Sequence, residues 1–153
     1  MKKSLLILIL TGLILAACGA PATEPAVKPD RTRTAAEWTA IRMSQSGGLA
    51  GVSRTISISR DGHGSVMDES AGKNAALTLT PEQLVQLEAI MASFTKLPKV
   101  ELDLNCADCF VYTLGFSFPE RNRTVQLSDT QLAASGYEPL VTFLRTLLDT
   151  TLQ

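Results

Sequence analysis

Histidine is nearly absent from this chain. His63 is the only one in 153 residues, and it lies in the turn-forming segment Asp61-Gly62-His63-Gly64. A lone histidine in an exposed turn makes a Ser-His-Asp or Cys-His nucleophile hard to assemble, and the His-Glu-x-x-His pair of zincin proteases is missing. No glycine-rich loop links a strand pattern to a helix pattern, so we expect no phosphate cradle. The sequence therefore predicts a protein that is not an enzyme and has no cofactor or metal, with His63 as a turn residue.

Positive charge is also scarce. The chain has 14 Lys and Arg against 15 Asp and Glu. Two of the lysines, Lys2 and Lys3, lie in an N-terminal segment that we expect to be removed, which leaves 12 basic residues, 15 acidic residues and a net charge of −3. Nucleic-acid-binding domains present a basic stripe or patch, and none is visible here. We predict no nucleic-acid partner.

The N-terminus has the parts of an export signal. Lys2 and Lys3 precede apolar runs over residues 5–10 and 13–15, and small residues lead to Cys18. The run is shorter than the roughly 20 apolar residues of a membrane span. The cysteine after small residues resembles the lipobox of bacterial lipoproteins. That resemblance implies a diacylglycerol-modified Cys18, cleavage before it, and a third acyl chain such as palmitate on the new N-terminus. An ordinary signal peptide with an incidental Cys18 is the alternative.

The rest of the chain divides into a tether and one domain. Residues 1–17 are the expected signal peptide. Residues 18–34 carry Cys18 and a tether with Pro21, Pro25 and Pro29 but no hydrophobic period. Residues 35–153 are long enough for one domain with one core. We expect an exported monomer, lipid-anchored to the cell membrane or envelope at an outer leaflet or the outer membrane.

Two cysteines remain after lipidation. Cys106 and Cys109 form a C-x-x-C pair, and an even number of thiols in an oxidising compartment favours a disulfide. A redox-active pair is the alternative, but such pairs use a helix N-terminus and positive charge. Here a strand pattern follows, and Asp103 and Asp108 surround the pair with negative charge. A zinc site would need two further ligands. We expect a structural disulfide that pins the start of the strand.

Hydrophobic periodicity predicts an α+β fold. Alternating patterns predict strands over residues 37–45, 53–60, 109–118 and 124–128, with a short additional strand over 64–67. Thr80-Pro81-Glu82-Gln83 is a capping-box start for a helix that ends at Leu97-Pro98, and Pro139 opens a second helix. We expect an antiparallel sheet of four to five strands with two helices on one face, in the order β-β-(β)-α-β-β-α.

A glycine-rich segment separates the first two predicted strands. Gly47, Gly48 and Gly51 fall within five residues of each other. Glycine loses more backbone entropy on folding than other residues, so a glycine-rich segment usually has a conformational reason. One interpretation is a wide hairpin that requires positive φ angles. The other is a tip slim enough to enter the cleft of another protein.

Three short motifs occur in order along the domain. They are Ile41-Arg42-Met43-Ser44-Gln45-Ser46-Gly47-Gly48-Leu49-Ala50-Gly51-Val52, then Asp108-Cys109-Phe110-Val111-Tyr112, then Thr124-Val125-Gln126-Leu127-Ser128-Asp129. Together they resemble the emfourin family of small bacterial proteins. The agreement in order and approximate spacing extends over residues 41–148. The lipoprotein signal, the tether and the C-x-x-C pair depart from the simplest members.

The emfourin resemblance implies inhibition of a thermolysin-like zinc metalloprotease, whose cleft the protein would occupy. It implies that Ser46, Gly47, Gly48 and Leu49 contact the protease, with Leu49 as the apolar anchor. It also implies that Arg42 and Arg54, on the flanking strands, contact an acidic rim. A non-inhibitory envelope binding or structural module on the same fold is the alternative.

Overall fold

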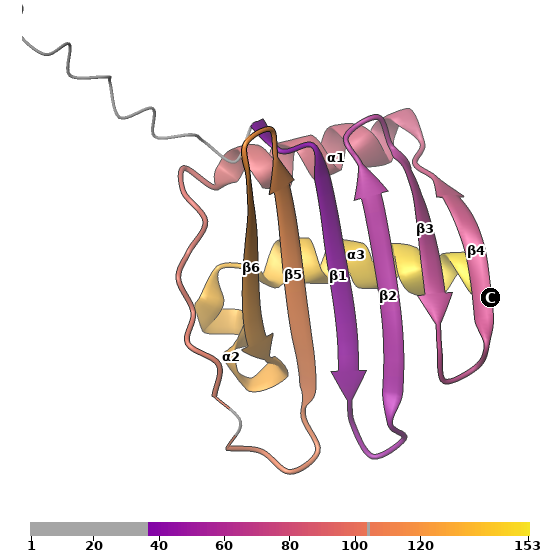
Figure 1. Cartoon of the computed structure of the whole chain (residues 1–153), viewed down its shortest axis with the longest axis vertical. Coiled ribbons are helices and arrows are strands. Elements are labelled where there is room, and N and C mark those ends of the chain that lie inside the picture. Colours follow the sequence, from indigo (N-terminus) through magenta and orange to yellow (C-terminus); the bar gives the residue numbers. More distant parts are fainter. Residues whose placement is uncertain (1–36, 104) are drawn as a thin grey trace, which may run out of the picture. The chain divides into compact units, whose positions relative to one another are not determined.

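The computed structural model describes residues 37–103 and 105–153; the expected signal, Cys18 and the tether lie outside the described residues. Within this part, six strands form one sheet in the order β4-β3-β2-β1-β5-β6, with every neighbouring pair antiparallel (Figure 1). The strands are β1 (Ala40–Gly47), β2 (Val52–Ser59), β3 (His63–Asp68), β4 (Lys73–Thr78), β5 (Phe110–Phe118) and β6 (Arg121–Ser128). The fold class is α+β.

The centre of the sheet is built on β1, which pairs with both β2 and β5. Met43 lies opposite Ile56 on one side and Leu114 on the other. Side chains of a strand alternate between the two faces, so these three residues, all fully buried, point to the same face. A strand was predicted over residues 109–118, and alternation on β5 buries one face of it: Tyr112, Leu114, Phe116 and Phe118.

Two long helices, α1 (Pro81–Ser93) and α3 (Glu138–Thr151), cover one face of the sheet, and α2 (Asp129–Ser135) follows β6 (Figure 1). The predicted capping box of α1 is confirmed. Thr80 Oγ1 accepts the Gln83 N–H at 3.2 Å, and Gln83 Oε1 accepts the Thr80 N–H at 2.9 Å. The opposite face of the sheet is left uncovered by the described helices, and we call it the open face. Among the residues described, no helix is long and apolar enough to cross a membrane.

Tyr137, directly before α3, joins the two layers. Its ring packs between those of Phe94 and Phe116, with centroids 5.4 and 6.0 Å away. Its hydroxyl donates to the Pro98 carbonyl at 2.8 Å, so the buried polar atom is satisfied. Burial away from water raises the pKa of Tyr137 to about 12, because the phenolate would lose its hydration.

The expectation of four to five strands and two helices was wrong, because the described residues form six strands and three helices. The strand β4 was missed because it has one buried apolar residue, Leu77, among polar residues and alanines. The helix α2 was missed although Ser128 and Gln131 form a capping box and Gly136 ends it with a positive φ. In addition, α1 ends at Ser93 rather than at Leu97, since Phe94 takes extended backbone and buries its ring.

Candidate functional site

Three loops meet at one end of the sheet, which we call the hairpin end. They are the β1–β2 turn around residues 47–51, the β3–β4 turn around residues 69–72, and the loop at residues 106–109 that precedes β5 (Figure 1). The strand register places them together, because Gly47 lies opposite both Val52 and Phe110. Most of the residues expected to contact a protease therefore fall on one surface.

The β1–β2 turn depends on glycine for its backbone shape. Gly47, Gly48 and Gly51 have φ angles of 103°, 71° and 61°, a region that other residues rarely adopt. The Gly51 N–H donates to the Gly48 carbonyl at 3.0 Å and closes the turn. We call residues 46–51 the glycine tip. The wide-hairpin interpretation accounts for these glycines, and it is compatible with a docking role for the side chains between them.

Leu49 lies at the apex of the glycine tip. The residue is 90% exposed, more than any other large apolar residue in the described part of the chain. The next most exposed, Val85 on α1 and Met67 on β3, are 69% and 37% exposed. A leucine held this far from the core contributes nothing to its packing, so it is available to a partner.

The loop with Cys106 and Cys109 packs directly against the glycine tip. The Gly48 N–H donates to the Cys109 carbonyl at 3.2 Å. A Cβ on Gly47 would collide with that same carbonyl, and one on Gly48 would lie 2.8 Å from the Phe110 ring. The two sulfur atoms lie at bonding distance, with the Cα atoms 5.6 Å apart. The cysteine pair thus fixes the backbone on which the tip rests.

Asp129 joins the cysteine pair in space, which the sequence analysis did not anticipate. Its carboxylate and the two sulfurs lie within 4.8 Å of one another, and Asp129 Oδ2 accepts the Phe110 N–H at 3.3 Å. A tetrahedral zinc site would need a fourth ligand and two free thiolates. Sulfur atoms at bonding distance do not offer such thiolates, so this arrangement suits a disulfide better than a metal.

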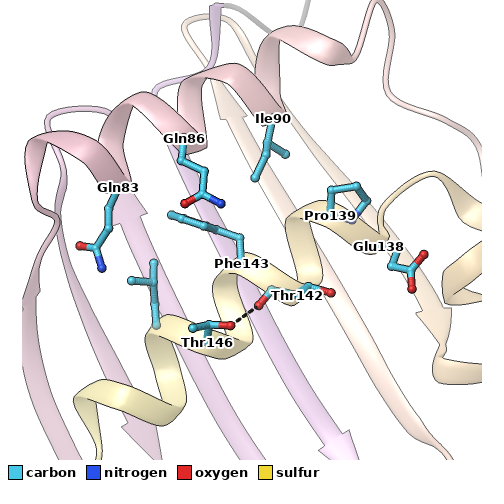
Figure 2. A pocket seen from close by; sticks show the side chains of 9 residues that line it. Gln83, Gln86, Ile90, Glu138, Pro139, Thr142, Phe143 and Thr146 are labelled. Atoms are coloured by element: carbon cyan, nitrogen blue, oxygen red, sulfur yellow. Dashed lines mark hydrogen bonds between the residues drawn. The ribbon is translucent and has the colours of Figure 1, made fainter.

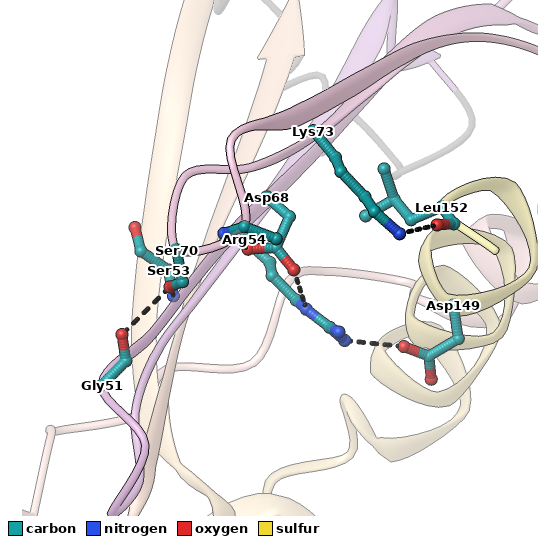
Figure 3. Close-up of polar contacts among 9 residues, drawn as sticks. Gly51, Ser53, Arg54, Asp68, Ser70, Lys73, Asp149 and Leu152 are labelled. Carbon is teal, nitrogen blue, oxygen red and sulfur yellow. Dashed lines mark hydrogen bonds and ion pairs between the residues drawn. The ribbon is translucent and has the colours of Figure 1, made fainter.

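A second set of contacts holds the other flank of the glycine tip. Ser70 Oγ donates to the Gly51 carbonyl at 3.1 Å and accepts the Ser53 N–H at 2.8 Å (Figure 3). Ser53 Oγ donates to the Glu69 carboxylate at 2.7 Å. The β3–β4 turn therefore supports the tip from the side opposite the cysteine loop.

Arg54 faces the helices rather than a prospective partner. Its guanidinium donates to Asp68 at 2.9 Å and to Asp149 of α3 at 2.8 Å (Figure 3). A hydrogen bond from the Ala71 N–H, together with Arg54, lowers the pKa of the Asp68 carboxyl below its usual value. Nearby, Lys73 Nζ donates to the Leu152 carbonyl at 3.1 Å. These contacts fasten the β2–β3–β4 edge to the end of α3.

Arg42 lies on the open face, away from both the glycine tip and Arg54. It alternates with the buried residues Ile41 and Met43, so its side chain points to the uncovered side. The structure thus groups Ser46, Gly47, Gly48 and Leu49 at the hairpin end but places Arg42 and Arg54 on opposite faces of the sheet.

Two other features are not part of the hairpin end. A groove of about 560 Å³ runs between α1 and α3, with Phe143 and Ile90 at its apolar base and Gln83, Gln86 and Glu138 around it (Figure 2). His63 lies at the opposite end of β3, where its N–H donates to Asp61 at 3.1 Å and its ring lies 3.4 Å from Thr78 Oγ1. The expectation of a turn residue was wrong in detail, because His63 is the first residue of β3 and pairs with Thr78 of β4 directly after the turn.

Comparison of the chain with protein-family models, curated proteins and solved structures found no significant match. The emfourin resemblance therefore remains a prediction from the three sequence motifs.

Proposed function

We propose that this chain is an exported lipoprotein, anchored through Cys18, whose domain inhibits a thermolysin-like zinc metalloprotease with its glycine tip. The observation that carries the proposal is the 90% exposure of Leu49 on a turn that neighbouring loops hold from both flanks. Burying a leucine stabilises a complex by about 1.5–3 kcal/mol. A turn that is already ordered loses little conformational entropy on docking.

The proposed contact surface is narrower than the sequence alone implied. Ser46, Gly47, Gly48 and Leu49 lie at the hairpin end and can enter a cleft together. The guanidinium of Arg54 is engaged by two carboxylates, and Arg42 points away on the open face. We therefore assign the protease contact to residues 46–49 and a supporting role to Arg54.

The choice of a thermolysin-like target rests on the emfourin resemblance. The resemblance assigns Leu49, as the apolar anchor, to the hydrophobic pocket of a thermolysin-type cleft. The alternative is a non-inhibitory binding module of the cell envelope on the same fold.

A titration distinguishes these two functions. The mature chain from residue 18, with Cys18→Ser so that it stays in solution, is titrated against thermolysin and related metalloproteases. The proposal predicts saturable inhibition with a nanomolar to micromolar constant and an intact inhibitor after long incubation. A folded protein that inhibits none of these enzymes, or that is simply cleaved, would favour the non-inhibitory module.

A further inference from the structure

The open face of the sheet has an unusual distribution of charge. The register assigns about half of the residues of all six described strands to this face, and not one of them is an aspartate or glutamate. Hydroxyl and amide side chains dominate, among them Ser44, Thr55, Ser57, Ser65, Asn74 and Thr113. The domain as a whole is acidic, so its carboxylates are segregated to other surfaces. A single arginine, Arg42, lies within this neutral field.

Arg42 stands near the middle of the face with free space beside it. On β1 it lies opposite Ser57 of β2 and Gly115 of β5. Gly115 has no side chain, and a Cβ there would come within 3.7 Å of the Arg42 Cβ. Arg54 and Arg60 each bind a carboxylate, at 2.9 and 3.2 Å, whereas no carboxylate of the described residues bonds to Arg42. Its guanidinium is exposed and available to an external anion.

The surface next to Arg42 is hollowed. A shallow depression of about 430 Å³ crosses β1 to β4, lined by Arg42, Thr55, Ser57, Ser65, Met67 and Asn74. Small side chains on β2 and β3 create it. Hydroxyl groups both donate and accept hydrogen bonds, and the Asn74 amide does the same. The depression therefore offers one cation and several neutral polar groups to a ligand.

We propose that the open face binds an acidic polysaccharide, with a uronate carboxylate on Arg42 and sugar hydroxyls on Thr55, Ser57, Ser65 and Asn74. Guanidinium binds carboxylate through two parallel hydrogen bonds, which a single exposed arginine can supply. Sugar hydroxyls match the hydroxyl and amide groups around it. An exported, anchored protein would meet such polymers at the cell surface.

Other partners fit this face less well. Protein interfaces usually centre on buried aromatic or large apolar side chains. The described open face has no Phe, Tyr or Trp; its aromatic ring is the imidazole of His63 at the start of β3, and Met67 is its one large exposed apolar residue. A second copy of this chain would bring two arginines together without a carboxylate between them. The face thus favours a polar, anionic ligand.

The proposed polysaccharide site is separate from the proposed protease contact. Leu49 lies at the apex of the hairpin end, whereas Arg42 lies within β1, between its pairing residues of β2 and β5. One cation per domain gives a weak contact that is sensitive to salt. Several membrane-anchored copies of the protein can bind repeated units of one polymer, and this multivalency strengthens the overall binding. A negative result in the protease assay would not argue against polysaccharide binding, and a negative result in the polysaccharide assay would not argue against protease inhibition.

The test measures binding of the mature Cys18→Ser chain to polygalacturonate by affinity electrophoresis, with dextran as the neutral polymer. We expect polygalacturonate to retard the protein and dextran to leave its mobility unchanged. Arg42→Gln should weaken binding about tenfold, as expected for loss of a charge-assisted hydrogen-bonded pair. Arg42→Lys should retain part of the binding, because lysine keeps the positive charge but lacks the paired N–H donors of the guanidinium. High salt should reduce binding of the unaltered protein.

Arg123→Gln is the matched control. Arg123 is an exposed arginine on β6 that alternation directs to the helix-covered side, so this change removes the same charge elsewhere. It should leave binding unchanged. An equal loss in Arg123→Gln and Arg42→Gln would overturn the site, since net charge alone would then explain binding. Absence of retardation, or equally strong binding of inorganic polyphosphate, would overturn the assignment to an acidic polysaccharide.

Discussion

Tyr137 connects the helix layer to the sheet through contacts on both sides. Its ring contacts Phe94 after α1 and Phe116 on β5, and its hydroxyl reaches the Pro98 carbonyl. The phenol in this position satisfies the backbone carbonyl of Pro98 in the loop that follows α1. The residue therefore contributes both apolar burial and one buried hydrogen bond.

Replacing Tyr137 with phenylalanine should lower the free energy of unfolding by about 1–3 kcal/mol, because the Pro98 carbonyl loses its partner. The same change should also alter how the free energy of unfolding depends on pH above pH 10. With a folded pKa of about 12 against 10 in the unfolded chain, the unfolded state releases its proton first, so stability falls as pH rises from 10 towards 12.

Urea unfolding followed over this pH range measures both effects. The Tyr137→Phe protein should lose less stability between pH 10 and 12 than the original, although the raised pKa of buried Tyr112 keeps part of the slope. An unchanged alkaline slope in Tyr137→Phe would show that Tyr137 does not ionise on unfolding in this range.

The sequence correctly predicted which residues of β1 and β2 are buried, but the faces to which Arg42 and Arg54 point were not considered. The alternation predicted over residues 37–45 buries Ile41 and Met43 on one face and puts Arg42 on the other. Arg54 shares the face of Ile56 and Ile58, which predicts a side chain turned towards the helices. Treating both arginines as contacts for one partner overlooked this two-residue period.

Among the helices and strands, those with strong local sequence patterns were predicted correctly, and those with weak patterns were missed. The helix α1 begins with a capping box, and β5 has uninterrupted alternation. By contrast, β4 is an edge strand that relies on pairing with β3, and no local signal marks Lys73–Thr78 as a strand. The contact between the cysteine loop and the glycine tip depends on strand register, which single-residue patterns do not reveal.

Reducing the Cys106–Cys109 pair should loosen the glycine tip. The Cys109 carbonyl accepts the Gly48 N–H, so freeing the cysteine loop weakens that hydrogen bond. Hydrogen exchange of the mature chain should show faster exchange at Gly48 after treatment with a dithiol reductant, with no change in the core amides of β1.

The Cys106→Ser and Cys109→Ser double variant should show the same faster exchange without reductant, and reductant should then have no additional effect. Equal exchange at Gly48 in the oxidised and reduced proteins would contradict the proposed support of the tip by the cysteine pair.

Considered as a whole, the molecule has one proposed lipid anchor and two separate proposed contact surfaces. If Cys18 carries lipid, the mature chain should partition into the detergent phase of a detergent–water separation when it is produced with its signal, because several acyl chains would anchor it stably. Cys18→Ala should shift the protein to the aqueous phase and remove incorporated labelled palmitate. A Cys18→Ala protein that stays in the detergent phase would contradict lipid anchoring at this residue.

The proposed role of Leu49 in inhibition is tested by comparing two exposed apolar residues in the inhibition assay. Leu49→Ser changes the glycine tip, and Val85→Ser makes a similar change on α1, away from it. The account predicts that Leu49→Ser raises the inhibition constant by about thirtyfold or more, as loss of a central anchor does, while Val85→Ser changes it less than about twofold. Unaltered inhibition by a folded Leu49→Ser protein would contradict protease inhibition through the glycine tip.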